Sequence, residues 1–291
     1  MVKIVRYGPK GQEKPGLVDS DGQIRDLSGV VSDITTENVR LSKLKVLKDI
    51  NPATLPLVEG EQRFGVPISN IGKIIAIGLN YADHAAESNL PVPPEPIYFT
   101  KSVTSLCGAN DDVMKPRDST KLDWEVELGV IIGKTMRYVE QKDALDHVAG
   151  YVLVNDVSER AFQKERGSQW VKGKGCDTFC PTGPWVLTAD EIGDPQDLDM
   201  FLDVNGVRMQ TGNTKTQIFS VAEALAYVSR FVTLQPGDLV ITGTPPGVGE
   251  GKKPDPIYLK EGDRIHLGVS KLGEQRQTVV PFSLEGLEII D

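Results

Sequence analysis

The sequence has few of the residues that build disulfides and zinc sites. It contains three cysteines and three histidines among 291 residues. Three cysteines are too few for a disulfide framework. Cys176 and Cys180 are close in sequence, but no second cysteine pair is present to complete a four-cysteine zinc site. We therefore expect a protein of the reducing cytoplasm without structural disulfides.

Long hydrophobic runs are also missing. No window of the chain approaches 18 apolar residues, which excludes a transmembrane helix. The first residues, MVKIVRYGPKGQEKPG, lack the apolar core of a secretory signal peptide. From these two absences we expect no membrane partner.

Basic residues are fewer than acidic ones. Lysine and arginine together number 32 against 41 aspartate and glutamate, which gives a formal net charge of −9. This balance argues against a nucleic-acid partner, which requires a basic surface. Hydrophobic residues make up 39% of the chain, so a real core can form. The 29 glycines and 19 prolines are spread along the chain and predict many turns.

Most of the chain is predicted to form short strands. Short β segments before residue 30 flank an Asp21-Gly22 turn, which predicts a hairpin, and Asn205-Gly206 predicts a second hairpin with a type I′ turn. Apolar runs predict further strands at 73–78, 124–133, 150–154, 239–242 and 264–269.

Helices are predicted at only a few places. Ser220 and Glu223 form a capping-box pattern that opens an amphipathic helix ending near residue 231. The stretches 36–49 and 81–89 are compatible with shorter helices, whereas the prolines between 91 and 96 exclude one there. The pattern predicts a mainly β or α+β fold rather than a doubly wound sheet.

Prolines also mark a predicted domain boundary. Pro52, Pro56 and Pro67 punctuate a connector, and we place the boundary near residue 70. The prediction is a small N-terminal α/β domain at 1–70 followed by a larger domain at 71–291, which carries all of the candidate site residues.

Two carboxylates stand at alternate positions of one predicted strand. Glu125 and Glu127 lie in the sequence DWEVELG, so their side chains point to the same face. Their apolar neighbours indicate burial, and two buried like charges repel unless a cation lies between them. An all-oxygen site of this type suits Mg²⁺, Mn²⁺ or Ca²⁺ rather than zinc. The alternative is an edge strand with one solvated acidic face.

A third carboxylate, Asp156, follows the apolar run 150–154 directly. A carboxylate at the end of a buried strand can complete a three-carboxylate metal site. The alternative is a turn residue or a helix cap, because 157–164 is also compatible with the start of a helix.

His84 and Glu87 are spaced by three residues on a predicted helical turn. At this spacing the carboxylate can orient the imidazole, which is the arrangement required of a general base that acts on water. The alternative is an ordinary surface pair.

Two glycine-containing segments offer further binding groups. Lys174 lies in KGKGCD, where a lysine among glycines can bind an anion, and Thr244 lies in TGTPPGVG, which offers a hydroxyl and backbone N–H groups. Neither segment has the order of a Walker or dinucleotide loop. The alternatives are an exposed cationic turn for the first segment and a plain Pro/Gly connection for the second.

Taken together, these segments resemble the fumarylacetoacetate hydrolase family in order and spacing over most of residues 71–270. Each motif alone is weakly or moderately specific, but the set is highly specific. The segments that carry the resemblance are GLNYADHAAE (78–87), DWEVELG (123–129), NDVSERAFQ (155–163), GKGCDTFCP (173–181) and TGTPPGVG (242–249).

The resemblance implies a mixed β-sandwich roll with short helices, in a homodimer, around a Mg²⁺ or Mn²⁺ ion. It implies that Glu125, Glu127 and Asp156 hold the metal and that His84 and Glu87 form the catalytic dyad. The remaining functional positions of the family correspond to a catalytic and substrate-contacting Lys174 and to substrate contacts at Arg160, Gln163 and Thr244.

The resemblance also implies a small anionic 2-oxo acid as substrate. The segments RYGPKGQEKPGLVD and NDVSERAFQ are similar to those of bacterial members that act on 2,4-diketo-3-deoxy sugar acids, derivatives of L-rhamnonate or L-fuconate. The implied reaction is hydrolysis of the C3–C4 bond of an acylpyruvate-type acid, such as L-2,4-diketo-3-deoxyrhamnonate, to pyruvate and a hydroxy acid.

Three alternative functions stay open at this point. They are ureidoglycolate lyase activity, decarboxylation or isomerisation of a 2-oxo acid on the same metal site, and binding of a 2-oxo acid without turnover. The segments 88–121 and 248–262 are expected to be loops near the site that influence which substrate is used.

Overall fold

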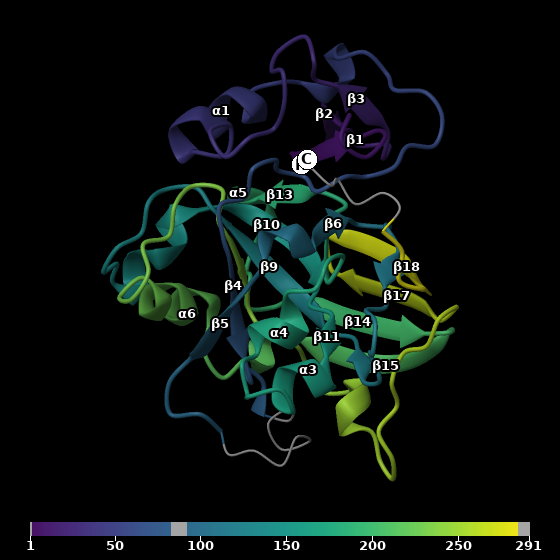
Figure 1. Ribbon diagram of the computed structural model, residues 1–291. Helices are drawn as coiled ribbons and strands as arrows, with labels where there is room; N and C mark the ends of the chain where they lie inside the picture. The colour runs from purple at the N-terminus through teal and green to yellow at the C-terminus, as the bar shows by residue number, and fades with distance from the viewer. Residues whose placement is uncertain (1, 83–91, 285–291) are drawn as a thin grey trace.

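The computed structural model describes residues 2–82 and 92–284, and most of their strands belong to two β-sheets packed face to face. Figure 1 shows the two sheets below a smaller N-terminal part that contains α1 (Leu41–Lys48) and three short strands. This mainly β architecture with short helices confirms the predicted fold class.

The larger sheet has eleven strands. Its main path runs through β3 (Ile24–Asp26), β2 (Lys14–Val18), β1 (Lys3–Tyr7), β13 (Val186–Thr188), β10 (Val148–Asn155), β9 (Val126–Ile132), β16 (Leu239–Ile241), β4 (Ile74–Gly78) and β5 (Ile97–Lys101). Off this path, β12 (Cys180–Thr182) pairs with β10 and with β6 (Leu106–Gly108).

The second sheet has five strands. Their order is β15 (Val207–Asn213), β14 (Asp199–Val204), β17 (Arg264–Val269), β18 (Gly273–Val280) and β7 (Val113–Met114). A separate two-stranded pairing joins β8 (Leu122–Asp123) to β11 (Ser158–Glu159).

The helices of the described residues are short. Besides α1 they are α3 (Arg160–Lys164), α4 (Val171–Lys174), α5 (Ala189–Ile192) and α6 (Val221–Val228). Short 3₁₀ turns are η1 (Pro52–Thr54), η2 (Val103–Ser105), η3 (Gln141–His147), η4 (Thr214–Thr216) and η5 (Gly249–Gly251). None of the helices within residues 2–82 and 92–284 has the length and apolar character needed to span a bilayer.

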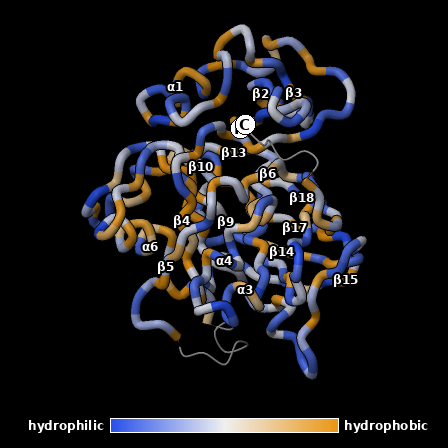
Figure 2. Tube along the Cα trace, in the orientation of Figure 1, coloured by the Kyte–Doolittle hydropathy of each residue, from blue (hydrophilic) through white to orange (hydrophobic). Residues whose placement is uncertain are grey.

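The central strands β9 and β10 are buried on both faces, which explains their near-continuous apolar sequences. Side chains alternate between the two faces of a strand. Leu128 and Leu153 therefore join the core between the two sheets, whereas Ile131 and Val152 join a second core that extends under α1. Figure 2 shows hydrophobic stretches beside β4 and β10 at the centre of the molecule.

The N-terminal strands are continuous with the larger sheet. β1 pairs antiparallel with β13, with Lys3 opposite Leu187, so the β1–β2–β3 meander extends the sheet of the remaining chain. The division of the chain at residue 70 stays a prediction.

The predicted hairpins form, with one difference in turn type. Asn205 and Gly206 both have positive φ, at 52° and 79°, as a type I′ turn requires. Between β2 and β3 only Gly22 has positive φ, and the Asp19 carboxylate accepts hydrogen bonds from the backbone N–H of Asp21 and Gln23. The first connection is therefore a longer Asp-stabilised loop rather than a two-residue turn.

Three element boundaries differ from those predicted. The Ser220 hydroxyl caps α6 as expected, but the helix ends at Val228 rather than near residue 231. The predicted helix at 36–49 is confined to α1, and 88–121 contains β5, β6 and β7 rather than loop alone. The predicted helix at 81–89 lies mostly outside the described residues.

We predict that Gly150→Ala destabilises the protein. Gly150 lies on β10, and a Cβ added there would be 2.3 Å from the backbone oxygen of Leu187 on β13. The strand would have to move, so we expect the free energy of unfolding to fall by about 2 kcal/mol. Gly29→Ala is the control, because no atom lies within 4 Å of a Cβ built there. Urea denaturation would test this, and equal midpoints for the two variants would contradict it.

Candidate active site

Two neighbouring carboxylates and a third that is about 30 residues away in sequence meet where β9 and β10 lie side by side. Glu127 on β9 is opposite Val154 on β10, Glu125 directly precedes β9 and Asp156 directly follows β10. Ligand oxygens of Glu125, Glu127 and Asp156 all lie within 4.8 Å of one another. All three residues are buried, so neither a solvated acidic face nor a surface turn describes them.

Lys174 is a central cation of this cluster. Its Nζ lies 2.6 Å from both Glu125 Oε2 and Asp156 Oδ2, and the residue is 2% exposed. Burial alone would lower the pKa of Lys174, but Asp156 and Glu125 raise it above its ordinary value, so the side chain stays charged. The interpretation of Lys174 as part of an exposed turn is therefore wrong.

Arg160 and Gln163 enter the same cluster from α3. The Arg160 guanidinium donates to Glu125 Oε1 at 2.6 Å and to Asp123 Oδ2 at 2.9 Å, and its third nitrogen lies 3.3 Å from Gln163 Oε1. The helix begins at Arg160 with Glu159 as its capping residue, so Asp156 is not a helix cap.

Lys101 is a buried cation that the sequence analysis missed. It lies at the end of β5, and its Nζ is 2.6 Å from Asp156 Oδ1 and 3.3 Å from the carbonyl oxygen of Val157. It also donates to the carbonyl oxygen of Lys174, so it joins the carboxylate cluster to α4. A lysine that ends an apolar strand, as in IYFTK, is the only signal that the sequence offers.

Glu127 is a buried carboxylate whose ionised form is disfavoured. Burial raises its pKa well above the ordinary value, and the charges of Asp156 and Glu125 raise it further. Its Oε2 accepts a hydrogen bond from the backbone N–H of Gly243 at 2.8 Å. A cation near Glu127 would favour its ionised form.

The donor set fits a hard divalent cation. Four buried carboxylates, counting Asp123, face three buried cations, Lys101, Arg160 and Lys174, so with all groups ionised the cluster keeps one net negative charge. Carboxylate oxygens are the ligands that Mg²⁺ and Mn²⁺ prefer. Glu125, Glu127 and Asp156 could therefore hold such an ion.

Thr244 lies beside the cluster on the loop that follows β16. Its hydroxyl donates to the backbone oxygen of Val126 at 2.9 Å and accepts from Gln210 Nε2 at 2.8 Å. The backbone of the same loop contacts Glu127 through Gly243. The predicted contact between Thr244 and a substrate stays a prediction.

A pocket opens onto these groups and has one aromatic wall. Phe99 and Trp170 meet edge to face, with ring centroids 5.2 Å apart. A Cβ at Gly78 would lie 2.7 Å from the Trp170 ring, so this glycine lets the indole approach the end of β4. The pocket is lined by Ile77, Gly78, Leu79, Phe99, Glu125, Glu127, Asp156, Arg160, Gln163, Lys164, Trp170, Lys174, Thr244 and Glu250. All predicted metal and substrate residues thus share one pocket, whereas His84 and Glu87 lie outside the described residues.

Comparisons with known proteins are consistent with this site. The family model described as fumarylacetoacetate (FAA) hydrolase C-terminal matches residues 73–280. A Sphingomonas protein named 2,4-didehydro-3-deoxy-L-rhamnonate hydrolase is 63% identical over 288 residues, which cover 99% of either chain. A putative hydrolase of Burkholderia lata is 57% identical over 276 residues, covering 95% of this chain and 98% of the relative.

Two solved structures show the same fold over nearly the whole chain. A fumarylacetoacetate hydrolase from Exiguobacterium antarcticum has a TM-score of 0.87 and 35% identity, covering 97% of this chain and 100% of its own. Maleylpyruvate hydrolase from Sphingobium, solved with manganese(II) and pyruvate, has a TM-score of 0.80 and 30% identity, with the same coverage.

We predict that Lys101→Met lowers the free energy of unfolding by about 3–5 kcal/mol, because it leaves one face of the buried Asp156 carboxylate without its cation. Lys121→Met is the matched control. Lys121 pairs with Glu165 at the surface, where such a pair contributes about 1 kcal/mol or less. Denaturant unfolding in the presence of EDTA would measure both, and a loss of under about 1 kcal/mol for Lys101→Met would show that the lysine is not needed to balance Asp156.

Proposed function

The chain belongs to the fumarylacetoacetate hydrolase family, and on this premise we propose that it is a metal-dependent enzyme that hydrolyses the C3–C4 bond of a 2,4-dioxo acid. The observation that carries the proposal is the buried group formed by Glu125, Glu127 and Asp156 in one pocket with Arg160 and Lys174. Carboxylates suit the metal, and the two cations suit an anionic substrate.

The substrate follows from the 63% identical relative, whose name specifies 2,4-didehydro-3-deoxy-L-rhamnonate. In chemical terms this acid is 5-hydroxy-2,4-dioxohexanoate, a pyruvate unit joined to a 2-hydroxypropanoyl group. Hydrolysis between C3 and C4 would give pyruvate and lactate. The maleylpyruvate hydrolase structure was solved with pyruvate, which supports a pyruvate-forming cleavage on this fold.

The metal centre would consist of Mg²⁺ or Mn²⁺ on Glu125, Glu127 and Asp156. When bound, the ion would supply Lewis-acid stabilisation of the negative charge that develops on the pyruvate half of the substrate. A homodimer and a cytoplasmic location complete the proposal, the first from the family resemblance and the second from three cysteines that are all free.

The protein's own groups would bind the substrate and transfer its protons. His84, oriented by Glu87, would accept a proton from water, and the hydroxide would add to the C4 carbonyl. Lys174, with Gln163, would donate to the oxyanion formed there. The C3–C4 bond then breaks with its electron pair going to C3, and the proton taken from water is returned to that carbon.

The remaining groups would hold the substrate in place during these steps. Arg160 would contribute positive potential toward the substrate anion, while Asp123 and Glu125 keep its guanidinium fixed. Thr244 would contact the substrate from the opposite loop.

We predict that pyruvate release from 5-hydroxy-2,4-dioxohexanoate is lost after EDTA treatment and restored by Mg²⁺ or Mn²⁺. A coupled pyruvate assay with product analysis would test the reaction. Full activity of the metal-free protein would refute the metal centre. Release of CO₂, a product with unchanged carbon number, glyoxylate from ureidoglycolate, or calorimetric binding without turnover would each replace hydrolysis with an alternative function.

We predict that His84→Ala lowers pyruvate release by at least about 100-fold, which is the usual contribution of a general base. Binding of Mn²⁺, measured by calorimetry, is expected to persist because the three carboxylates remain. His266→Ala is the control, since His266 lies on β17 and pairs with Glu274 away from the pocket. Undiminished pyruvate release by His84→Ala would remove this residue from the mechanism.

A further inference from the structure

Glu250 is an acidic side chain in a pocket proposed to bind an anion. It lines the same pocket as the three carboxylates, yet it is not part of their cluster. Its Oε2 lies 2.5 Å from Lys164 Nζ and 3.8 Å from Arg160 Nε. Arg160 therefore contacts Glu125 directly and has Glu250 at longer range, and Glu250 lines the pocket without being one of the proposed metal ligands.

The position of Glu250 is fixed by its backbone. The N–H groups of Gly249 and Glu250 donate to the carboxylate of Asp123, at 2.6 and 3.0 Å. Asp123 is fully buried and also binds Arg160, so one carboxylate accepts hydrogen bonds from both the loop backbone and the guanidinium. The indole N–H of Trp124 donates to the carbonyl oxygen of Gly247 at 3.2 Å.

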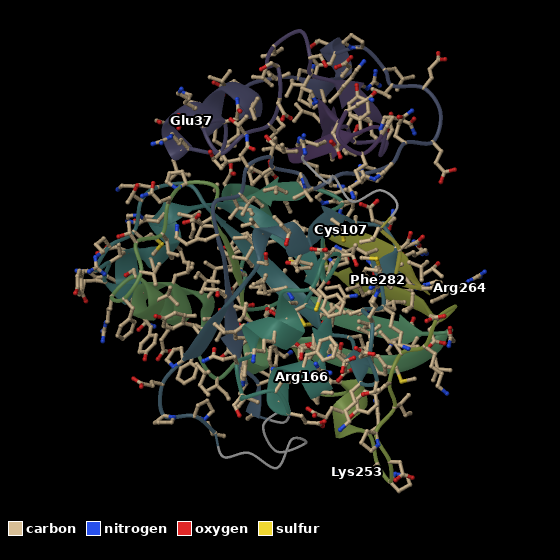
Figure 3. The ribbon with its side chains drawn as sticks, in the orientation of Figure 1. Glu37, Cys107, Arg166, Lys253, Arg264 and Phe282 are labelled. Carbon is tan, nitrogen blue, oxygen red and sulfur yellow. The ribbon has the colours of Figure 1, made fainter. Side chains whose placement is uncertain are left out.

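Two glycines of the loop lie in close backbone contact with neighbouring residues. A Cβ at Gly247 would lie 2.0 Å from the backbone oxygen of Met209, and one at Gly249 would lie 2.0 Å from that of Ile257. Figure 3 shows Lys253 at the tip of the same loop, directed away from the body of the molecule. The loop thus presents one fixed carboxylate to the pocket while its tip faces solvent.

The rest of the pocket outside the carboxylate cluster differs in chemistry. Phe99 and Trp170 form the apolar wall described above, and Leu79 also lines the pocket. Such a wall suits the hydrocarbon part of an acyl group, whereas a carboxylate suits a hydroxyl donor. Lys164 contacts Oε2 of Glu250, and because a carboxylate has about four acceptor positions, Oε1 can accept a further hydrogen bond.

We propose that Glu250 determines the acyl specificity of the enzyme by accepting a hydrogen bond from a hydroxyl group next to the C4 carbonyl of the substrate. The inference rests on the proposed function and specifies its substrate class as 2-hydroxyacyl pyruvates. The same charge disfavours acyl chains that end in a carboxylate, because it repels them and occupies Lys164. Glu250 thus selects for a hydroxyl group and against a second negative charge.

The test compares two acids that differ in one hydroxyl group, 5-hydroxy-2,4-dioxohexanoate and 2,4-dioxohexanoate. The wild type is expected to prefer the hydroxylated acid in kcat/KM. Glu250→Met should lower that preference by about 10–100-fold, the range expected when a hydrogen bond to a charged group is lost. Glu250→Gln keeps a hydrogen-bond acceptor without the charge, so its preference should lie between those of the wild type and Glu250→Met.

Glu165→Met is the matched control. It removes one negative charge at the end of α3, but Glu165 pairs with Lys121 at the surface and does not line the pocket. The preference ratio of this variant should equal that of the wild type. Thermal unfolding would confirm that the compared variants are folded.

A third acid should be hydrolysed better, not worse, by a Glu250 variant. A general loss of structure would not raise kcat/KM. With 2,4-dioxoheptanedioate, whose acyl chain ends in a carboxylate, Glu250→Gln should raise kcat/KM relative to 2,4-dioxohexanoate by about tenfold, since a repelling charge is removed and Lys164 becomes available to that carboxylate.

The outcomes separate the two proposals. If the wild type hydrolyses 2,4-dioxohexanoate as well as the hydroxylated acid, or if Glu250→Met leaves the ratio unchanged, the role of Glu250 is refuted and the proposed function stands. If the wild type releases pyruvate from none of the three acids, both are refuted.

Discussion

The site depends on one constraint, the burial of several like charges at a single place. Glu125, Glu127 and Asp156 lie within 4.8 Å of one another and are almost fully buried. Their repulsion must be balanced, and the surrounding elements supply the balance with Lys101 from β5 and Lys174 from α4. These lysines balance the negative charge only in part, and the charge that is left makes the cluster suited to a divalent ion.

Asp123 links this cluster to the rest of the pocket. It binds Arg160, which itself binds Glu125, and it accepts two backbone hydrogen bonds from the loop that carries Glu250. The groups proposed for chemistry and the group proposed for acyl recognition are therefore held by one buried network.

Local patterns predicted the elements that build the site better than they predicted element boundaries. The apolar runs of β9 and β10 and the turn at Asn205-Gly206 are evident in the sequence because each is enforced by neighbouring residues. Helix ends were less predictable, since α6 stops at Val228 and the next residues continue as turns, with the N–H groups of Arg230 and Phe231 bonded to carbonyl oxygens three residues back. The first hairpin differs from prediction because the Asp19 carboxylate stabilises a longer loop.

The sequence by itself determined which residues could meet, through carboxylates at alternate strand positions and motifs whose order resembles one family. Only the tertiary structure decided which charges are paired. Lys101 is 55 residues from Asp156, and Glu250 is 86 residues from Lys164, so no local spacing connects them. Strand pairing and burial bring these distant charges together in the protein interior, where an unpaired charge costs free energy. The spacing of residues along the sequence does not show which charges will be buried together.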